Sequence, residues 1–508
     1  MILLDLCSAA GLECPADAAQ IAVEGICTHT GRLTAGQLFV ALRGKHADGH
    51  DFLTDAKTRG ACAAIIDREF AGNLPTGLPV LRVDSTRAAH ARLLDAWYGN
   101  PSAHMQFVGV TGTNGKTSVA WMLYGLLRQA QIPCALIGTV CCEGPCGALT
   151  EDTEGMTTPE PERLYPMLAA LHRQGTQIVV MEVTSHALAQ QRCAPIRFSL
   201  GIFTNITRDH LDYHGSMEAY VDAKKQLLGQ CERVLLNVDD ERVAALQAQS
   251  PCPVLTCSVK QKRADYRAEA ASVATSGVQY QLTSARACMR IACRMGGQFA
   301  LPNSLQAAVA GLLLGLKAQD VRDGMAQVPP VPGRMEQLAL PAGVPFSVII
   351  DYAHTPDALE NLLAAVRKCK TRAGRVVLVF GCGGDRDQGK RAQMGQIASR
   401  MADYFVITAD NSRTESLDAI LADIVRGVDR RAHYRVLRDR ERAIRHVIEH
   451  AKAGDVILLA GKGHEQYELT KNEKRPFDER AIVECAVREY WKRVFYQTDI
   501  ESDSESGE

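Results

Sequence analysis

The chain has 508 residues, which is too long for a single hydrophobic core and predicts two to four domains. A hydrophobic content of 46%, a charged content of 23% and a formal net charge of −1 are typical of a globular protein. They give no electrostatic reason to expect a nucleic acid or an anionic membrane as partner. The apolar stretch LQAAVAGLLLGL is shorter than the roughly 20 residues that cross a bilayer, so no membrane insertion is expected.

The N-terminal sequence MILLDLCSAAGLECPADAA has an acidic residue where an export signal carries its basic region, so we expect a cytoplasmic protein. Seventeen cysteines in such a chain are expected to be reduced thiols. The close cluster CCEGPC contains Cys141, Cys142 and Cys146, but no second pair follows at the spacing of a zinc site. A zinc site is therefore not predicted there.

Three blocks follow one another along the chain. Residues 1–103 contain short apolar runs, QLFVAL, CAAIID and PVLRV, and predict a small α/β domain. Residues 104–332 alternate strand-like and helix-like segments, with the strand-like runs VGVT, IVVMEV, LGIFTN and VLLNVDD. After the linker-like VPPVPGR, residues 333–495 repeat this rhythm in FSVIID, RVVLVF, YFVIT and DVILLA. Such alternation indicates parallel sheets covered by helices on both faces.

The predicted fold class is therefore α/β with three domains: a small N-terminal α/β domain, a central P-loop ATPase-like parallel-sheet domain and a C-terminal Rossmann-like domain. Polar clusters follow the strand-like runs, and ligands of such sheets bind beyond the carboxyl ends of the strands. Residues 496–508 are acidic and lack apolar anchors, so we predict a disordered tail there.

The segment TGTNGKTS, residues 111–118, lies between a strand-like and a helix-like run and predicts a phosphate-binding loop. Gly112 and Gly115 allow the tight turn that aims backbone N–H groups at phosphate oxygens. Lys116 is suited to the terminal phosphates and Thr117 to Mg²⁺. Val110 stands where the strict motif has a glycine, so the loop is a variant. ATP is the favoured nucleotide.

This variant loop resembles that of the Mur ligases, the ATP-dependent peptide ligases of bacterial cell-wall synthesis. The resemblance extends over about residues 20–490 and includes TTPEP, EVTSHALAQQR, FTNITRDHLDYHG, EAYVDAKKQLL, PGRMEQL, DYAHTPDALENLL, FGCGGDRDQGKR, DNSR and GKGHE. It implies that ATP phosphorylates a substrate carboxylate, and that an amine then attacks the acyl phosphate to give an amide, ADP and phosphate.

Among these enzymes, the chain is most similar to those that add the third residue of the peptide stem. The resemblance implies small-molecule substrates, a monomer, and a role in peptidoglycan precursor synthesis. The reaction would join meso-2,6-diaminopimelate to the D-Glu γ-carboxylate of UDP-N-acetylmuramoyl-L-Ala-D-Glu. Two alternatives are the corresponding L-lysine-adding ligase and a folylpolyglutamate synthase-like ligase, which needs neither the first domain nor DNSR. A non-catalytic relative would be expected to lack Lys116, Glu182 or Lys224, and all three are present.

The resemblance also implies roles for individual residues around ATP. Those matched to ATP binding are Gly112, Thr113, Asn114, Gly115, Lys116, Thr117, Ser118, Asn303, Asp351 and His354. For Asn303, a helix-capping role is an equally good interpretation. Those matched to Mg²⁺ are Thr117, Glu182, His210 and Lys224, and the catalytic set is Lys116, Glu182, His210 and Lys224.

Two of the residues matched to Mg²⁺ are unusual ligands for this metal ion. Histidine is an unusual ligand for a hard cation, but His210 lies in a strand-end cluster with Asn205, Asp209 and Asp212. From the residues alone, Lys224 would be an ordinary surface lysine on a helix. The resemblance instead implies a carbamate formed with CO₂ (N6-carboxylysine), a carboxylate-like metal ligand, and hence an activity that depends on bicarbonate.

The matched positions for the UDP-muramoyl-dipeptide are Thr28, Thr30, Lys45, His46, Ala47, Thr157, Thr158, Thr184, Gln190 and Arg192. Hydroxyl groups and one arginine suit a phosphorylated, carboxylated acceptor. The family usually has Asp-Ser-Arg where this chain has His29, Thr30 and Gly31, so the hydroxyl is kept and the charges are lost.

The matched amino-acid contacts are Arg386, Asp410, Asn411, Ser412, Arg413, Gly461 and Glu465, with Ser412 in place of the usual proline. Two arginines suit carboxylates and Glu465 suits an ammonium group, and diaminopimelate carries both groups at each end. Lysine lacks the distal carboxylate, and leaving Arg413 desolvated without a partner would cost about 3–5 kcal/mol. Diaminopimelate is therefore predicted over lysine.

Overall fold

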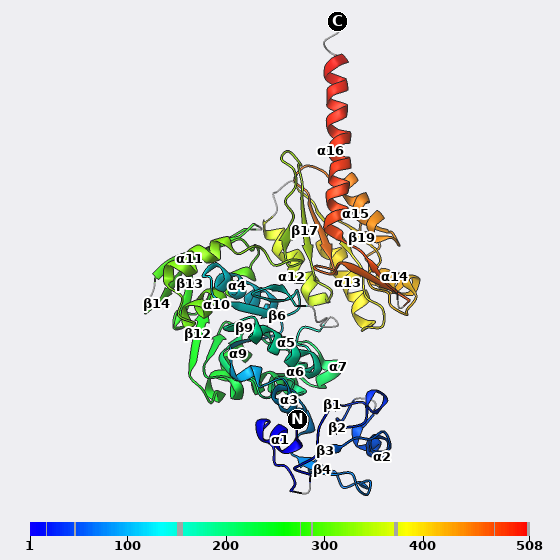
Figure 1. Ribbon diagram of the computed structural model, residues 1–508. Coiled ribbons are helices and arrows are strands. Elements are labelled where there is room, and N and C mark those ends of the chain that lie inside the picture. The colour runs from blue at the N-terminus through cyan, green and yellow to red at the C-terminus, as the bar shows by residue number, and fades with distance from the viewer. Residues whose placement is uncertain are drawn as a thin grey trace. The chain divides into compact units, whose positions relative to one another are not determined.

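The computed structural model describes residues 1–16, 18–44, 47–149, 156–274, 276–285, 288–369, 374–471 and 473–504 (Figure 1). It divides into two compact units. The first comprises Met1–Glu269, Leu282–Met289 and Pro302–Gly324, and the second comprises Ala270–Gln281, Arg290–Leu301 and Met325–Glu508. Parallel sheets with connecting helices confirm the predicted α/β class. The domain boundaries at residues 103, 332 and 495 stay predictions.

The N-terminal part of the first unit is a four-stranded parallel sheet with the order β1-β2-β3-β4. Alternate residues of its strands face opposite sides, as period-2 burial requires. Leu38 and Ile65 pack with α1 and α3, whereas Phe39 and Ile66 pack with α2. The elements are α1 Leu3–Ala9, β1 Gly25–Cys27, β2 Gln37–Val40, α2 Leu53–Thr58, β3 Ala63–Asp67, β4 Val80–Val83 and α3 Thr86–Trp97.

The central part of this unit contains strands in the order β12-β11-β10-β5-β9-β6-β7-β8. The pairs from β12 to β6 are parallel, and β7 and β8 add an antiparallel edge. The strands are β5 Gln106–Thr111, β6 Cys134–Ile137, β7 Cys142–Gly144, β8 Gly147–Ala148, β9 Ile178–Glu182, β10 Phe198–Phe203, β11 Val234–Asn237 and β12 Val254–Ser258. The helices are α4 Lys116–Gln129, α5 Pro161–Arg173, α6 Ser185–Ala189, α7 Leu211–His214, α8 Met217–Lys225 and α9 Glu241–Ala245.

Three strands and two helices follow before the linker-like segment. They are β13 Tyr266–Val273, β14 Val278–Ser284, β15 Cys288–Cys293, α10 Ala300–Leu313 and α11 Ala318–Gln327. The central β10, β5 and β9 are buried along nearly their whole length, because they lie inside the sheet with helices over them. Their carboxyl ends therefore lie side by side at one edge, where the polar loops of the sequence begin.

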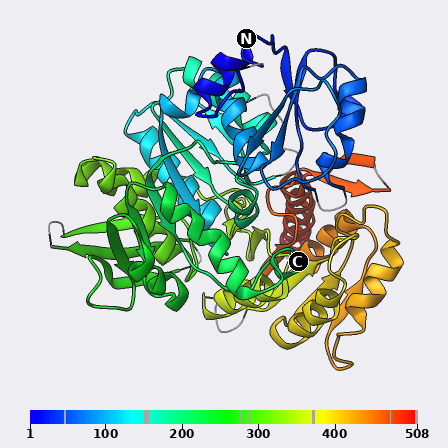
Figure 2. The same cartoon turned by 90° about the horizontal axis from the view of Figure 1, so that it is seen from below.

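The second unit contains a six-stranded sheet with the order β16-β17-β21-β18-β19-β20, parallel except for β16. Helices α12, α13 and α14 pack on one face, and α15 and α16 pack on the other (Figures 1 and 2). The strands are β16 Glu336–Gln337, β17 Ser347–Asp351, β18 Val376–Phe380, β19 Tyr404–Ile407, β20 Tyr434–Val436 and β21 Val456–Ala460. The helices are α12 Pro356–Cys369, α13 Gly389–Met401, α14 Leu417–Val425, α15 Arg440–Glu449 and α16 Glu479–Ser504, with a hairpin of β22 Tyr467–Thr470 and β23 Glu473–Pro476 before α16.

The C-terminal helix corrects one prediction. Residues 496–504, predicted to be disordered, continue α16, while residues 505–508 lie outside the described residues. Val483, Ala486 and Val487 pack against α15 and anchor the helix. Once a helix is nucleated by packing, each further residue adds a hydrogen bond without a new nucleation cost, so the acidic segment extends it. Among the described residues, no helix combines the length and apolarity needed to cross a bilayer.

Candidate active site

The phosphate-binding loop follows β5 and leads directly into α4. Gly112 has φ 150°, and a Cβ there would overlap Thr204 Oγ1. Gly115, with φ 88°, precedes the first residue of α4. The Asn114 N–H donates to Asn205 Oδ1 at 2.9 Å, and Thr204 Oγ1 donates to the Asn114 carbonyl at 2.6 Å. The end of β10 therefore holds the loop at the N-terminus of α4, the position that favours phosphate.

Lys116 and Asn303 both lie at this loop. Lys116 Nζ donates to the carbonyls of Gly112 and Thr113 at 2.9 and 3.0 Å. Asn303 is nearly buried, and its Oδ1 lies 2.5 Å from where a Cβ on Gly115 would stand. Since α10 begins at Ala300, Asn303 lies within the helix and the helix-capping interpretation is wrong. Its contact with adenine stays a prediction.

Glu182 ends β9 beside the loop and is 1% exposed. Its Oε2 accepts hydrogen bonds from Thr117 Oγ1 at 2.9 Å and Thr139 Oγ1 at 3.2 Å, and its Oε1 accepts the Thr139 N–H at 2.8 Å. A buried carboxylate beside the hydroxyl of a phosphate loop supplies the oxygen ligands that Mg²⁺ prefers. The oxygen atoms of Glu182 and Thr117 are therefore suitable ligands for the predicted Mg²⁺.

His210 lies on the segment after β10 and precedes α7 with φ 51°, in the left-handed region. Its ring is half exposed, lies 4.7 Å from the ring of His186, and has Nε2 3.5 Å from Asp209 Oδ2. The structure thus places Glu182 and His210 after strands on either side of β5. A role for His210 at the metal stays a prediction.

Lys224 lies on α8 and is 1% exposed, so the interpretation as an ordinary surface lysine is wrong. Its Nζ donates to the Gly112 carbonyl at 2.8 Å and lies 4.7 Å from the centre of the Tyr220 ring. Burial, reinforced by the charge of Lys116, holds the pKa of Lys224 well below its usual value, although Asp209 acts in the opposite direction. A neutral amine is the form that reacts with CO₂.

The residues predicted for the muramoyl-dipeptide form a connected set around β9 and α6. Thr158 Oγ1 donates to the Glu182 carbonyl at 2.9 Å, and the Thr184 N–H donates to Thr158 Oγ1 at 3.0 Å. Arg192 Nη1 donates to the Thr158 carbonyl at 2.6 Å, and its Nη2 donates to Gln190 Oε1 at 2.7 Å. Hydrogen bonds thus join the residues predicted to bind the acceptor directly to Glu182, the carboxylate predicted to bind Mg²⁺.

Thr157 also belongs to this region, because its hydroxyl lies 3.0 Å from that of Thr139. A cavity of about 100 Å³ lies against Gln190 and Arg192. Its full lining is Leu42, Arg87, His90, Glu160, Pro161, Glu162, Gln190 and Arg192. Burial lowers the pKa of Arg192, while the carboxylate of Glu160, 2.5 Å away, opposes that shift. The cavity is bounded by side chains from both the N-terminal and the central parts of the first unit.

The predicted uridine region is only partly described, because Lys45 and His46 lie outside the described residues. Thr28 Oγ1 donates to Glu162 Oε1 at 3.2 Å, and Thr30 is nearly buried in a short 3₁₀ turn. His29 Nδ1 accepts the Gly31 N–H at 3.0 Å and so caps that turn. The Ala47 carbonyl accepts the Gly44 N–H at 2.9 Å. His29, which stands where the family usually has an aspartate, therefore has a structural role as the cap of this turn.

In the second unit, the predicted residues follow four neighbouring strands, β17, β21, β18 and β19. Asp351 ends β17, and its carboxylate accepts the N–H groups of Met335 and Ala353 at 2.7 and 2.8 Å. Burial raises the pKa of Asp351, while the charge of Arg334 and these hydrogen bonds act in the opposite direction. His354 is exposed, and its carbonyl accepts Lys390 Nζ at 2.9 Å.

Asp410, Asn411, Gly461 and Glu465 come together after β19 and β21. Asn411 Nδ2 donates to Glu465 Oε2 at 2.7 Å, and a Cβ on Gly461 would lie 3.0 Å from Asp410 Oδ2. Burial opposes the charge on Asp410, but Lys462 and Arg440 outweigh it and lower the pKa of Asp410. Burial and the nearby Asp410 raise the pKa of Glu465. The neighbouring carboxylates of Asp410 and Glu465 suit an ammonium group.

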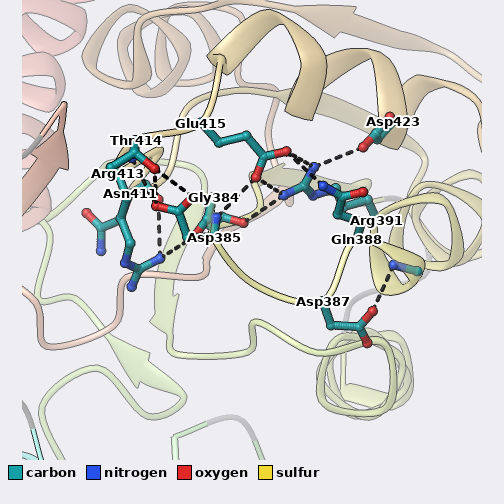
Figure 3. Close-up of polar contacts among 12 residues, drawn as sticks. Gly384, Asp385, Asp387, Gln388, Arg391, Asn411, Arg413, Thr414, Glu415 and Asp423 are labelled. Carbon is teal, nitrogen blue, oxygen red and sulfur yellow. Dashed lines mark hydrogen bonds and ion pairs between the residues drawn. The ribbon is translucent and has the colours of Figure 1, made fainter. Parts of the chain in front are cut away.

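Arg413 is half-buried and has φ 51°. Its Nη1 donates to the Gly384 carbonyl at 2.8 Å and to the Asn411 carbonyl at 3.4 Å (Figure 3). Within the described part of the chain these are its side-chain hydrogen bonds, so Nε and Nη2 can form a fork to a carboxylate. Arg386 is exposed on the loop after β18, and Ser412 is nearly buried between the two loops.

Three family models match the chain: the Mur ligase middle domain over residues 110–311, the Mur ligase glutamate ligase domain over 333–463, and the Mur ligase family catalytic domain over 22–98. A UDP-N-acetylmuramoyl-L-alanyl-D-glutamate–2,6-diaminopimelate ligase of Geobacter metallireducens is 38% identical over 493 residues, 92% of this chain and 94% of its own length. The chain is a Mur ligase. As the sequence predicts, it is therefore an ATP-dependent ligase that forms an amide bond.

Other relatives of this Mur ligase carry the same name. The one from Chromobacterium violaceum is 41% identical over 473 residues, 91% of this chain and 94% of its own length. A solved structure with that name has a TM-score of 0.68 at 28% identity and covers 96% of this chain and 99% of its own. A folylpolyglutamate synthase of Mycobacterium tuberculosis shares the fold, with a TM-score of 0.59 at 18% identity over 74% of this chain and 93% of its own.

Two buried cations of this Mur ligase were not predicted from the sequence. Lys462 Nζ donates to Asn411 Oδ1 at 3.0 Å and lies 3.8 Å from Asp410 Oδ1. Arg440 Nη1 and Nη2 donate to the carbonyls of Ala409 and Ala460, which precede the two loops of the site. The lysine within GKGHE was a visible signal for the first. The second follows a polar turn far from any motif, and only its burial reveals it.

The glycine at the start of the phosphate loop provides a direct test of the site. Gly112→Ala places a methyl group against Thr204 and forces alanine into a positive φ, so we expect ATP affinity to fall at least about 10-fold. Calorimetric titration with a non-hydrolysable ATP analogue measures this. In the control, Gly229→Ala, the new methyl group meets no heavy atom within 4 Å. Unchanged affinity in Gly112→Ala would contradict the assignment of the loop.

Proposed function

We propose that this Mur ligase joins meso-2,6-diaminopimelate to the D-Glu γ-carboxylate of UDP-N-acetylmuramoyl-L-Ala-D-Glu in peptidoglycan precursor synthesis. The observation that carries the proposal is that the loops after β19 and β21 bring together one half-buried guanidinium, Arg413, and two carboxylates, Asp410 and Glu465. Relatives that are 38% and 41% identical bear the name of this activity, which supports the proposal.

The first step transfers the γ-phosphoryl group of ATP to the substrate carboxylate. Backbone N–H groups of residues 112–118 and the N-terminus of α4 bind the phosphates, and Lys116 neutralises charge that spreads over the transferred group. Thr117, Glu182 and His210 would hold Mg²⁺, which supplies charge neutralisation when bound. The amine of the amino acid then attacks the acyl phosphate, forms the amide and expels phosphate. Excluding water from the acyl phosphate protects it from hydrolysis.

Lys224 is proposed to bear a carbamate. Its neutral amine attacks CO₂, a C–N bond forms, and a proton is released, so a cationic side chain becomes an anionic one with two oxygen atoms. The burial of Lys224 supports this, because removal from water, together with the nearby charge of Lys116, disfavours the ammonium form relative to the neutral amine. The carbamate would complete the oxygen ligands of Mg²⁺.

The amino-acid site suits a substrate with a charged group at each end. Asp410 and Glu465 suit one ammonium group, and the free fork of Arg413 suits one carboxylate. Arg386, exposed on the neighbouring loop, would bind a second carboxylate. Lysine would leave one guanidinium without its anion, and a site built around a polar group rejects an analogue that lacks it by about 10⁴-fold.

The decisive assay measures phosphate release from ATP with UDP-N-acetylmuramoyl-L-Ala-D-Glu as acceptor. We expect release that requires added amino acid, with kcat/KM for meso-diaminopimelate about 10³- to 10⁴-fold above that for L-lysine. Reactions without acceptor and reactions with a folate and glutamate are the controls. Equal use of lysine, or activity with the folate pair, would favour the corresponding alternative ligase.

A further inference from the structure

Hydrogen bonds connect the loop after β18, which carries Arg386, to the loop after β19, which carries Arg413 (Figure 3). The Gly384 N–H donates to the Asn411 carbonyl at 2.9 Å, and Arg413 Nη1 donates back to the Gly384 carbonyl at 2.8 Å. Thr414 donates to Asp385 from its N–H at 3.0 Å and from its hydroxyl at 2.8 Å. The loop after β18 therefore determines where the Arg413 guanidinium lies.

An ion pair between a buried arginine and a partly buried glutamate supports these contacts between the loops. Arg391, in the first turn of α13, is 0% exposed. Its Nη1 and Nη2 lie 2.7 and 2.6 Å from the two carboxylate oxygens of Glu415, in a bidentate arrangement. Arg391 Nη2 also donates to the Gly383 carbonyl at 3.3 Å, and Glu415 Oε2 accepts the Asp385 N–H at 3.1 Å. Both partners thus hold the backbone of residues 383–385.

We propose that Glu415 and Arg391 are positioning residues that set the affinity for the distal carboxylate of the amino-acid substrate. They do so by holding the loop whose Gly384 carbonyl fixes Arg413 and from which Arg386 projects. This inference rests on the proposed function and deepens it. Neither residue belongs to the set of substrate contacts proposed above, and the contacts of the pair lie within residues 383–423.

The physical reason is that a guanidinium that is not held in position binds a carboxylate less tightly. A fork-to-fork contact with a carboxylate needs its two N–H groups aligned with two oxygen atoms, and a displacement of about 1 Å costs about 10²-fold. The shorter of the two hydrogen bonds of Arg413 is to the Gly384 carbonyl, so movement of residue 384 moves the guanidinium. The hydrogen bonds of Arg391 lower the pKa of Glu415 to about 2, so the pair stays charged throughout the neutral range.

Glu415→Gln tests the proposal, because it keeps the shape of the side chain and removes its charge. We expect KM for meso-diaminopimelate to rise about 10- to 100-fold, while KM for ATP and for the UDP-muramoyl-dipeptide stay within about 2-fold of wild type. Arg391→Lys keeps the charge and loses the fork, and should act in the same direction. The double variant should be no worse than the more affected single variant, since the two residues act as one unit.

Asp423→Asn is the matched control. Asp423 lies 2.9 Å from Arg391 Nη1, but its side-chain contacts within the described residues are with Arg391 and Arg426 and not with the loop backbone. KM for diaminopimelate should therefore stay within about 2-fold of wild type. Thermal unfolding of each variant shows whether it is folded. An equal rise of KM for all three substrates would overturn the positioning role. The same holds if KM for meso-diaminopimelate rises in neither Glu415→Gln nor Arg391→Lys. A wild-type enzyme that does not use diaminopimelate would instead contradict the proposed function.

Discussion

Lys224→Ala is expected to lower turnover at least about 10³-fold, because it removes a proposed metal ligand worth several kcal/mol of charge stabilisation. The side chain is buried against the Gly112 carbonyl, and burial lowers its pKa, which favours the neutral amine that reacts with CO₂. Wild-type activity should likewise fall in buffer stripped of CO₂ and recover when bicarbonate is added. Steady-state phosphate release measures both effects.

The carbamate itself can be observed without turnover. Protein equilibrated with ¹³C-bicarbonate should give a carbamate carbon signal in NMR spectra that is absent from Lys224→Ala. Lys225→Ala, the next residue on α8, is the matched control and should keep both the signal and the activity. Lys224→Gln keeps a side chain of similar length and tests whether packing alone matters. Full activity in Lys224→Ala would remove the proposal, and a signal that persists there would place the carbamate elsewhere.

Strand positions were predictable from the sequence because strands buried on both faces consist of continuous runs of apolar residues. IVVM within IVVMEV and VILLA within DVILLA are continuous apolar runs, and the structure has β9 and β21 there. The polar residues that follow them then had to gather at one edge of a parallel sheet. For this reason the phosphate loop, Glu182 and DNSR could be assigned to strand ends from the sequence alone.

Burial of long polar side chains could not be predicted in the same way. Lys224 and Arg391 lie on helices whose sequences are rich in polar residues, and long cationic side chains on such helices are usually exposed. Each is buried because a partner distant in the sequence meets it: the Gly112 carbonyl for Lys224, and Glu415 for Arg391. The extension of α16 through Ser504 was missed for a related reason, since its anchor lies in the packing of Val483 and Val487 and not in the acidic segment itself.

Arg413→Ala is expected to lower kcat/KM for meso-diaminopimelate about 10²- to 10³-fold, because the distal carboxylate would be desolvated without its cation. KM for ATP should stay within about 2-fold of wild type. The use of lysine, already poor, should hardly change, so the preference for diaminopimelate over lysine should shrink by nearly the whole loss. This change in preference distinguishes a specificity contact from a general defect of the loop.

Two further variants sharpen the test of Arg413. Arg493→Ala removes an exposed arginine of α16, whose Nη1 donates to Glu449 Oε1 at 2.8 Å, and should behave as wild type with every substrate. Arg413→Lys keeps one positive charge but offers no fork, so it should recover only part of the lost kcat/KM. If Arg413→Ala instead lowered the use of ATP and of diaminopimelate equally, the guanidinium would support the fold of the loop. The choice of amino acid would then have to depend on Arg386, which is exposed and therefore less suited to select between substrates that differ by one carboxylate.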